Sequence, residues 1–265
     1  MDLGLHGKTA IVTGASRGIG LAIASALHRE GVSLVLVARS QDALAKAARD
    51  LTSREGSAAP PVHPIAADLG MRAEVERVVA QAIARLGHVD ILVNNAAQAQ
   101  TGSFFDMSED DWQAVWQVKA FGYVRMVTAL SRHMMERESG SIINIIGTAA
   151  RTPTEDFIIG GMVNAALLNF TRGIARILAH KNVRINSISP GWTRTEGQQR
   201  HLEMVAAAQG KTVEEVERRE ARGVPLGRLV TMEEIAEMAL LLASDSVPAM
   251  TGEDIIIDGG ATPSI

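Results

Sequence analysis

The chain has 265 residues, a length that one α/β domain can occupy without splitting. Hydrophobic residues make up 46% and charged residues 21%, which is typical of a folded globule and not of a disordered chain. The absence of cysteine excludes disulfides and thiolate metal sites, and no metal site is expected. The net charge is -4, with both signs dispersed, so no basic stripe is offered to nucleic acid. We expect a small-molecule partner and a cytoplasmic location.

The N-terminal residues do not resemble a targeting segment. No basic stretch there is followed by an apolar core, and we find no apolar run of the ~18 to 20 residues that a membrane-spanning helix requires. The expectation is a protein that is neither secreted nor inserted into a membrane.

Short runs rich in valine and isoleucine alternate with longer amphipathic stretches along the chain. This alternation indicates successive βαβ units around a parallel sheet. Seven strands are predicted, at residues 9–13, 33–38, 62–66, 89–93, 141–146, 183–188 and 254–257. Covering helices are predicted at 41–54, 71–86 and 231–243, where apolar residues recur every three or four positions. The predicted fold is therefore α/β, one domain over residues 1–265, with a seven-stranded parallel sheet flanked by helices on both faces.

Residues 196–222 interrupt this alternation. The segment is long, polar and helical in composition, and it follows a strand end, where open α/β sheets bind ligands. We interpret it as a helical lid over a substrate.

A glycine-rich turn follows the first strand and precedes a helix-forming run. Glycine at such positions allows a tight turn and close approach of a pyrophosphate, which the helix N-terminus attracts. The spacing Gly-x-x-x-Gly-x-Gly resembles the dinucleotide-binding turn of the short-chain dehydrogenases/reductases. The turn contains Gly14, Ser16, Arg17, Gly18, Ile19 and Gly20.

The resemblance continues in order from Gly7 to Gly260. One match is the acid after the third strand that hydrogen-bonds the adenine, a second is the Asn-Asn-Ala turn after the fourth strand, and a third is a Pro-Gly turn whose following threonine contacts the nicotinamide amide or pyrophosphate. The resemblance implies a single NAD(P)-binding Rossmann domain. Beyond the glycine turn, the cofactor residues implied are Arg39, Asp68, Leu69, Asn95, Ala96, Asn164, Pro190, Gly191 and Thr195.

Charge at the end of the second strand predicts which nicotinamide cofactor binds. A carboxylate there would bond the two ribose hydroxyls of NAD and repel a 2′-phosphate. This chain has Ala38 followed by Arg39, and Arg17 lies in the glycine turn. Two guanidinium groups can form charge-assisted bonds to a 2′-phosphate, so NADP(H) is favoured over NAD(H).

The resemblance fails at the catalytic positions. The family uses a tyrosine whose pKa is lowered by a lysine four residues later, a serine that polarises the substrate oxygen, and an asparagine that holds a relay water. Aligning the motifs places Asn164 in the lysine slot, Gly160 in the tyrosine slot and Gly147 in the serine slot. Gln117 is assigned to the asparagine slot. The only tyrosine, Tyr123, lies before the fifth strand.

Substitutes for these catalytic groups are available nearby. Thr148 could donate a hydrogen bond as the serine does, Asn164 could bond the nicotinamide ribose, and Gln117 could hold a water. The catalytic residues expected are therefore Thr148, Asn164 and Gln117. Gly160, with Gly161, is expected to leave open space where a phenol would stand.

A charged loop follows the fifth strand, where substrates approach in this family. Glu155 or Asp156 could act as a general acid if burial raised its pKa, and Arg151 could bind an acidic substrate group.

Three functions are compatible with these residues. The first is an NADP(H)-dependent oxidoreductase acting on an unidentified carbonyl or alcohol with a non-standard proton relay. The second is a catalytically silent NADP(H)-binding protein or partner subunit. The third is a non-redox lyase or hydratase that uses the charged loop.

The resemblance also implies an assembly of identical chains, a homotetramer or a homodimer. The predicted helices around the fifth strand carry more apolar surface than one sheet face needs, at Trp112, Trp116, Met126, Leu167, Leu168 and Phe170.

Overall fold

The computed structural model describes residues 2–55, 59–98 and 100–263 and contains one seven-stranded sheet. All strand pairs are parallel, in the order β3-β2-β1-β4-β5-β6-β7. The strands are β1 (Thr9–Thr13), β2 (Ser33–Ala38), β3 (Val62–Ala66), β4 (Ile91–Asn94), β5 (Gly140–Ile145), β6 (Val183–Pro190) and β7 (Asp254–Ile257). The fold predicted from the periodicity is confirmed.

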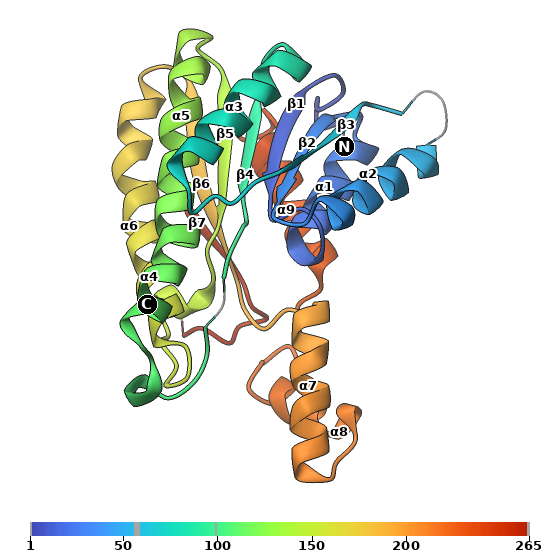
Figure 1. The fold of residues 1–265 in the computed structure, drawn as a ribbon, viewed down its shortest axis with the longest axis vertical. Helices are drawn as coiled ribbons and strands as arrows, with labels where there is room; N and C mark the ends of the chain where they lie inside the picture. Colours follow the sequence, from blue (N-terminus) through green and yellow to red (C-terminus); the bar gives the residue numbers. More distant parts are fainter. Residues whose placement is uncertain (1, 56–58, 99, 264–265) are drawn as a thin grey trace.

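Helices cover both faces of this sheet (Figure 1). One face carries α1 (Gly18–Arg29), α2 (Gln41–Glu55) and α9 (Met232–Ala243). The other carries α3 (Arg72–Leu86), α5 (Gly122–Glu136) and α6 (Ile158–Ala179). Successive strand residues alternate between the two layers: Ala10 and Val12 pack on the first side and Ile11 on the second. Because both sides are covered, the five inner strands are buried almost throughout, while the edge strands β3 and β7 are mostly half-buried.

Short helical segments surround the carboxyl edge of the sheet. They are η2 (Phe104–Asp106), α4 (Glu109–Val115) and η4 (Thr148–Ala150), together with one turn of π-helix, η3 (Trp116–Phe121), between α4 and α5. A π-helical turn shifts the register of the side chains that follow it and is frequent at functional sites.

The predicted strand bounds were off by up to two residues. β4 begins at Ile91 and not at residue 89, because the Asp90 carboxylate accepts hydrogen bonds from N and Oγ1 of Thr9 at the start of β1. β6 runs on to Pro190, which still pairs with Ile257 of β7.

The segment 196–222 is helical, as predicted. It forms α7 (Glu196–Gln209) and α8 (Val213–Ala221), capped by Thr195 and Thr212. The two helices project away from the carboxyl edge of the sheet (Figure 1) and share a small core of Leu202, Ala206 and Val216. That this unit closes over a substrate stays a prediction.

One helix bears on the expectation that no segment spans a membrane. By length and composition, α6 is apolar enough to cross a bilayer. Half of its apolar window is buried, and the helix packs against β6 and η4. The core helix of a folded α/β protein passes the same length-and-composition test.

A buried carboxylate fastens the loop after β5 to the far edge of the sheet. Asp254, whose side chain has no exposed area, forms an ion pair with Arg151 and accepts hydrogen bonds from the hydroxyls of Ser187 (2.6 Å) and Ser189 (2.8 Å). Removing one partner of such a group leaves the others unsatisfied.

We predict that Asp254→Ala lowers the free energy of unfolding by about 3 kcal/mol, as expected for one lost partner of a buried pair. Urea unfolding at fixed pH measures the change. The matched control is Asp245→Ala, at an aspartate that is 75% exposed and pairs with Lys8; its effect should stay within ~1 kcal/mol. Equal effects of the two substitutions would contradict the role given to Asp254.

Candidate cofactor and active site

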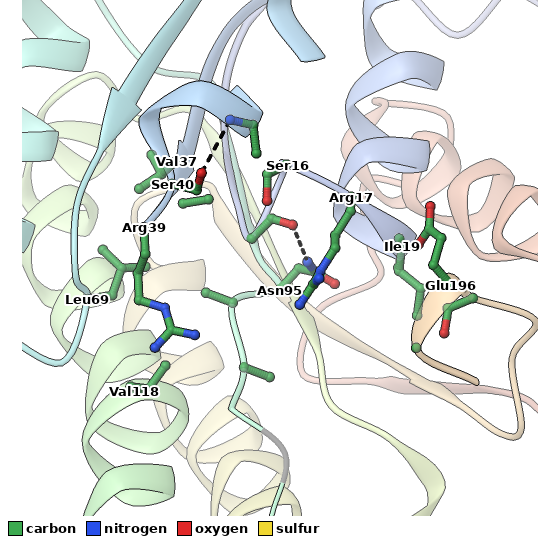
Figure 2. Close-up of a pocket in the computed structure, with 18 of the residues that line it drawn as sticks. Ser16, Arg17, Ile19, Val37, Arg39, Ser40, Leu69, Asn95, Val118 and Glu196 are labelled. Atoms are coloured by element: carbon green, nitrogen blue, oxygen red, sulfur yellow. Dashed lines mark hydrogen bonds between the residues drawn. The ribbon is translucent and has the colours of Figure 1, made fainter. Parts of the chain in front are cut away.

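A pocket of about 550 Å³ opens at the carboxyl edge of β1, β2 and β4. Most of the residues expected to bind a cofactor line it: Gly14, Ser16, Arg17, Gly18, Ile19, Arg39, Asp68, Leu69, Asn95, Ala96 and Thr195. Figure 2 shows Arg39 beside Leu69 and Val118, and Arg17 on the glycine-turn side near Asn95. Residues from five separate stretches of sequence therefore meet here.

The glycine turn is braced by Asn95. Its Nδ2 donates to the carbonyl oxygens of Thr13 (3.1 Å) and Gly14 (3.3 Å). Gly14 has φ +64°, and a Cβ atom there would lie 2.7 Å from this amide. A Cβ on Gly20 would overlap the same amide. Gly20 therefore does not line the pocket but lets helix α1 pack against the turn.

The charges of the pocket suit a phosphorylated dinucleotide. α1 begins at Gly18 without a side-chain cap, so its first N–H groups are free to bind an anion. Arg17 and Arg39 are exposed, and within the described residues neither guanidinium pairs with a carboxylate. Asp68 is exposed at the opposite wall, its Oδ1 accepting from the amide of Gly70. The residues present therefore fit NADP(H).

Sequence reasoning missed two charged residues of this pocket. Glu196 and Arg200, both in the first turns of α7, line it as well. They were assigned only to the lid segment, because nothing in their spacing shows that α7 starts beside the glycine turn.

Besides Gly20, three expected cofactor residues lie outside the pocket lining. Pro190 and Gly191 end β6, where the amide of Gly191 donates to the carbonyl of Ile257. A Cβ on Gly191 would lie 2.6 Å from that of Asp258, so glycine permits this close approach of two strand ends. Asn164 lies deeper, in α6, beside Gly147.

Gly147 could not carry the family's serine without strain. Its φ is +127°, a conformation that L side chains rarely adopt. A Cβ atom there would also lie 3.0 Å from Nδ2 of Asn164. Thr148, the next residue, opens η4, and its carbonyl accepts from the hydroxyl of Thr152.

Gln117 does not reach Asn164. Its side chain is exposed, and its Oε1 accepts a hydrogen bond of 2.7 Å from Arg125. The π-helical turn instead directs Lys119 inward: its Nζ donates to Oδ1 of Asn164 (2.6 Å) and to the carbonyl of Ile146 (2.7 Å). The expectation for Gln117 is therefore corrected to Lys119, and lysine and amide have exchanged helices relative to the family pattern.

Lys119 is a buried cation whose partners within the described residues are all neutral. Burial lowers the pKa of its ammonium from 10.5 to about 8. The sequence contained a signal for this position that the motif alignment passed over. Val115, Lys119 and Tyr123 are spaced four apart, so a buried helical stripe includes the lysine. Burial also raises the pKa of Tyr123, whose hydroxyl donates to the carbonyl of Ile145.

The open space expected at Gly160 does not exist. A Cβ atom on Gly160 would overlap the ring of Phe157, three residues earlier. An aromatic ring without a hydroxyl thus stands over the position from which the family's tyrosine would project. Gly161 is buried against the carbonyl of Ala149.

The charged loop offers no buried acid. Glu155 and Asp156 are both exposed. Arg151 is committed to Asp254. No metal-binding cluster occurs among the residues that the structure describes.

The fold and the pocket define a dinucleotide-binding protein of the Rossmann class, and comparisons with known proteins narrow this class. A family model described as enoyl-(acyl carrier protein) reductase matches residues 14–262. NADPH-dependent reductase BacG of Bacillus subtilis is 31% identical over 258 residues, 97% of this chain and 99% of that protein. Oxidoreductase UcpA of Salmonella typhimurium is 34% identical over 262 residues, with 97% and 95% covered.

A solved structure supports the same class of protein. L-sorbose reductase from Gluconobacter frateurii, complexed with NADPH and L-sorbose, matches with a TM-score of 0.95 at 31% identity over 100% of both chains. The chain belongs to the short-chain dehydrogenase/reductase family of oxidoreductases.

We predict that Gly147→Ser, although it installs the family's residue type, destabilises the protein by about 1–3 kcal/mol because of its backbone conformation. Thermal or urea unfolding measures this. Gly173→Ala is the matched control, since Gly173 lies in α6 with no atom near its Cβ position and should gain ~0.5–1 kcal/mol. If Gly147→Ser left the free energy of unfolding unchanged, the loop would have relaxed to accommodate the serine.

The lowered pKa of Lys119 predicts a pH-dependent stability. Between pH about 8 and 10.5 the unfolded chain binds a proton at this lysine that the folded chain has released, so the free energy of unfolding rises with pH across that window. Lys119→Met should remove this rise. Urea unfolding at several pH values compares it with wild type, with Gln117→Met as a non-titrating control on the same turn. A pH-independent difference between Lys119→Met and wild type would contradict the assignment.

Proposed function

We propose that the protein is an NADP(H)-dependent oxidoreductase that acts on a small carbonyl or alcohol substrate with a proton relay unlike that of its family. The observation that carries the proposal is the pair of free guanidinium groups, Arg17 and Arg39, at a cofactor pocket whose glycine turn is intact. BacG, UcpA and L-sorbose reductase support the oxidoreductase class, and BacG and L-sorbose reductase support the phosphorylated cofactor.

In this proposal, each part of the cofactor is bound by particular residues of the chain. The N-terminus of α1 binds the pyrophosphate, Arg17 and Arg39 bind the 2′-phosphate, and Asp68 accepts from the adenine amino group. The reduced nicotinamide, when bound, supplies a hydride. In this proposal Thr195 and the Pro190–Gly191 turn border the nicotinamide side, and the Pro190 carbonyl lies near Gly147. With the tyrosine absent, solvent water is the proton source in this proposal.

A homotetramer or homodimer and a cytoplasmic location belong to the same proposal. Met126, Leu167 and Leu168 are ordinary core residues, and Trp112, Trp116 and Phe170 are partly buried against the core. The exposed apolar side chains on these helices are instead Phe121, Met162 and Ile177, and they are the surface that a second copy would cover.

The first experiment is titration with NADPH and with NADH, followed by nicotinamide fluorescence, and then addition of a carbonyl panel to the tighter complex. Micromolar NADPH binding with consumption of NADPH supports the proposal. Binding without oxidation of NADPH by any member of the panel would favour a silent binding protein instead.

We predict that Arg17→Ala and Arg39→Ala each weaken NADPH binding by ~10- to 100-fold, the cost of a lost charge-assisted hydrogen bond, and leave NADH binding nearly unchanged. Fluorescence titration measures both constants. Arg172→Ala, at an exposed arginine of α6, is the matched control. A loss of equal size for NADH and NADPH would show that these arginines do not contact the 2′-phosphate.

A further inference from the structure

Asn164 is held in one orientation by Lys119. A lysine ammonium has donors only, so the amide must turn its Oδ1 toward Nζ of Lys119, and the structure has this contact at 2.6 Å. The orientation of the amide therefore follows from the chemistry of its neighbour. Nδ2 is left pointing the other way, toward the bare side of Gly147, where a Cβ atom would be 3.0 Å away.

This Nδ2 group has no partner within the described residues, although Asn164 is only 2% exposed. It is not one of the fully buried unpartnered atoms, which in the described chain are Asn94 Oδ1 and His133 Nε2. It therefore faces space that a ligand atom can reach. A buried amide donor without a partner is costly unless something fills that place.

Gly147 follows the end of β5, at the carboxyl edge of the sheet where the cofactor pocket opens. The carbonyl of Pro190, from the turn that ends β6, is 3.9 Å from the same Cβ position. Because Gly147 has no side chain, the Asn164 amide can lie against it, beside the place where the family's serine would stand.

We propose that Asn164, polarised by the Lys119 ammonium, is the hydrogen-bond donor of this active site and that its Nδ2–H binds a carbonyl or carboxylate oxygen of the substrate. The assignment of that oxygen to a substrate rests on the proposed function. Asn164 contacts the substrate and is a catalytic residue, while Lys119 acts through it and is a positioning residue.

The Lys119–Asn164 pair can stabilise the negative charge that develops during carbonyl reduction. When a carbonyl is reduced, negative charge develops on its oxygen, and a preorganised donor in a dry site stabilises that charge. The Lys119 ammonium draws electron density from the amide through Oδ1, so that Nδ2–H becomes a stronger donor. The Asn164 amide, polarised by the buried Lys119 ammonium, thus takes the place of the family's serine and tyrosine hydroxyls.

The test uses the full-length protein saturated with NADP⁺, which cannot reduce the probe, and titrates it with acetate as an oxygen ligand. The Asn164 side-chain amide is followed in the ¹⁵N spectrum and assigned by its loss in Asn164→Asp. That variant keeps an acceptor for Lys119 and deletes the donor. We expect acetate to shift the Asn164 resonance in wild type and to bind at least ~10-fold more weakly in Asn164→Asp, since a bond to a charged group is lost.

The matched control is Asn169→Asp, the same substitution at an exposed position of α6, which should bind acetate as wild type does. Lys119→Met should also weaken acetate binding, and the double variant Lys119→Asn with Asn164→Lys should restore it by returning a donor to position 164. Restoration would separate this role from a merely structural one.

Two results would overturn the proposal. In the first, acetate binds Asn164→Asp as tightly as it binds wild type. In the second, acetate binding is lost in Thr148→Val, and acetate does not shift the Asn164 resonance of the wild-type protein. Failure of the proposed function looks different. In that case no carbonyl in the panel oxidises NADPH, although acetate still shifts the Asn164 amide.

Discussion

The structure depends on one constraint: a parallel sheet must be buried on both faces. Each strand is followed by a connection that returns to the opposite edge, so every strand of this sheet ends at the same side. The glycine turn after β1, Arg39 after β2, Asp68 after β3, Asn95 after β4 and Gly147 after β5 are brought together for this reason alone. Their separation along the chain has no bearing on their closeness in space.

Much of this could be predicted from the sequence because periodicity and glycine spacing report directly on backbone geometry. The strands at residues 9–13 and 33–38 and the pocket lined by Arg17 and Arg39 were recovered from such patterns. The sequence did not show which way certain side chains point. Gln117 and Lys119 are two residues apart, and only the π-helical turn decides which of them points inward. Likewise, a glycine at 160 suggested a cavity, and only the fold shows that the Phe157 ring fills it.

The geometry also bears on the alternative functions. A lyase or hydratase built on the charged loop needs a poised acid or a free cation, but Glu155 and Asp156 are exposed and Arg151 is bound to Asp254. That loop is fastened to the sheet and carries no buried titratable carboxyl of its own. The proposed chemistry is therefore assigned to Asn164, which lies beside Gly147.

A catalytic site that simply decays loses residues independently, and the neighbours of each lost residue keep their old chemistry. Here the changed positions match one another. The buried ammonium of Lys119 has an amide oxygen to bind, since position 164 is asparagine; a second lysine there would place two cations in contact. Gly147 leaves room for the Asn164 amide that a Cβ would crowd, and Gly160 leaves room for the Phe157 ring. Restoring the family residue at position 147, 160 or 164 alone would create a clash or an unpaired charge. The altered residues therefore form one arrangement whose parts require each other.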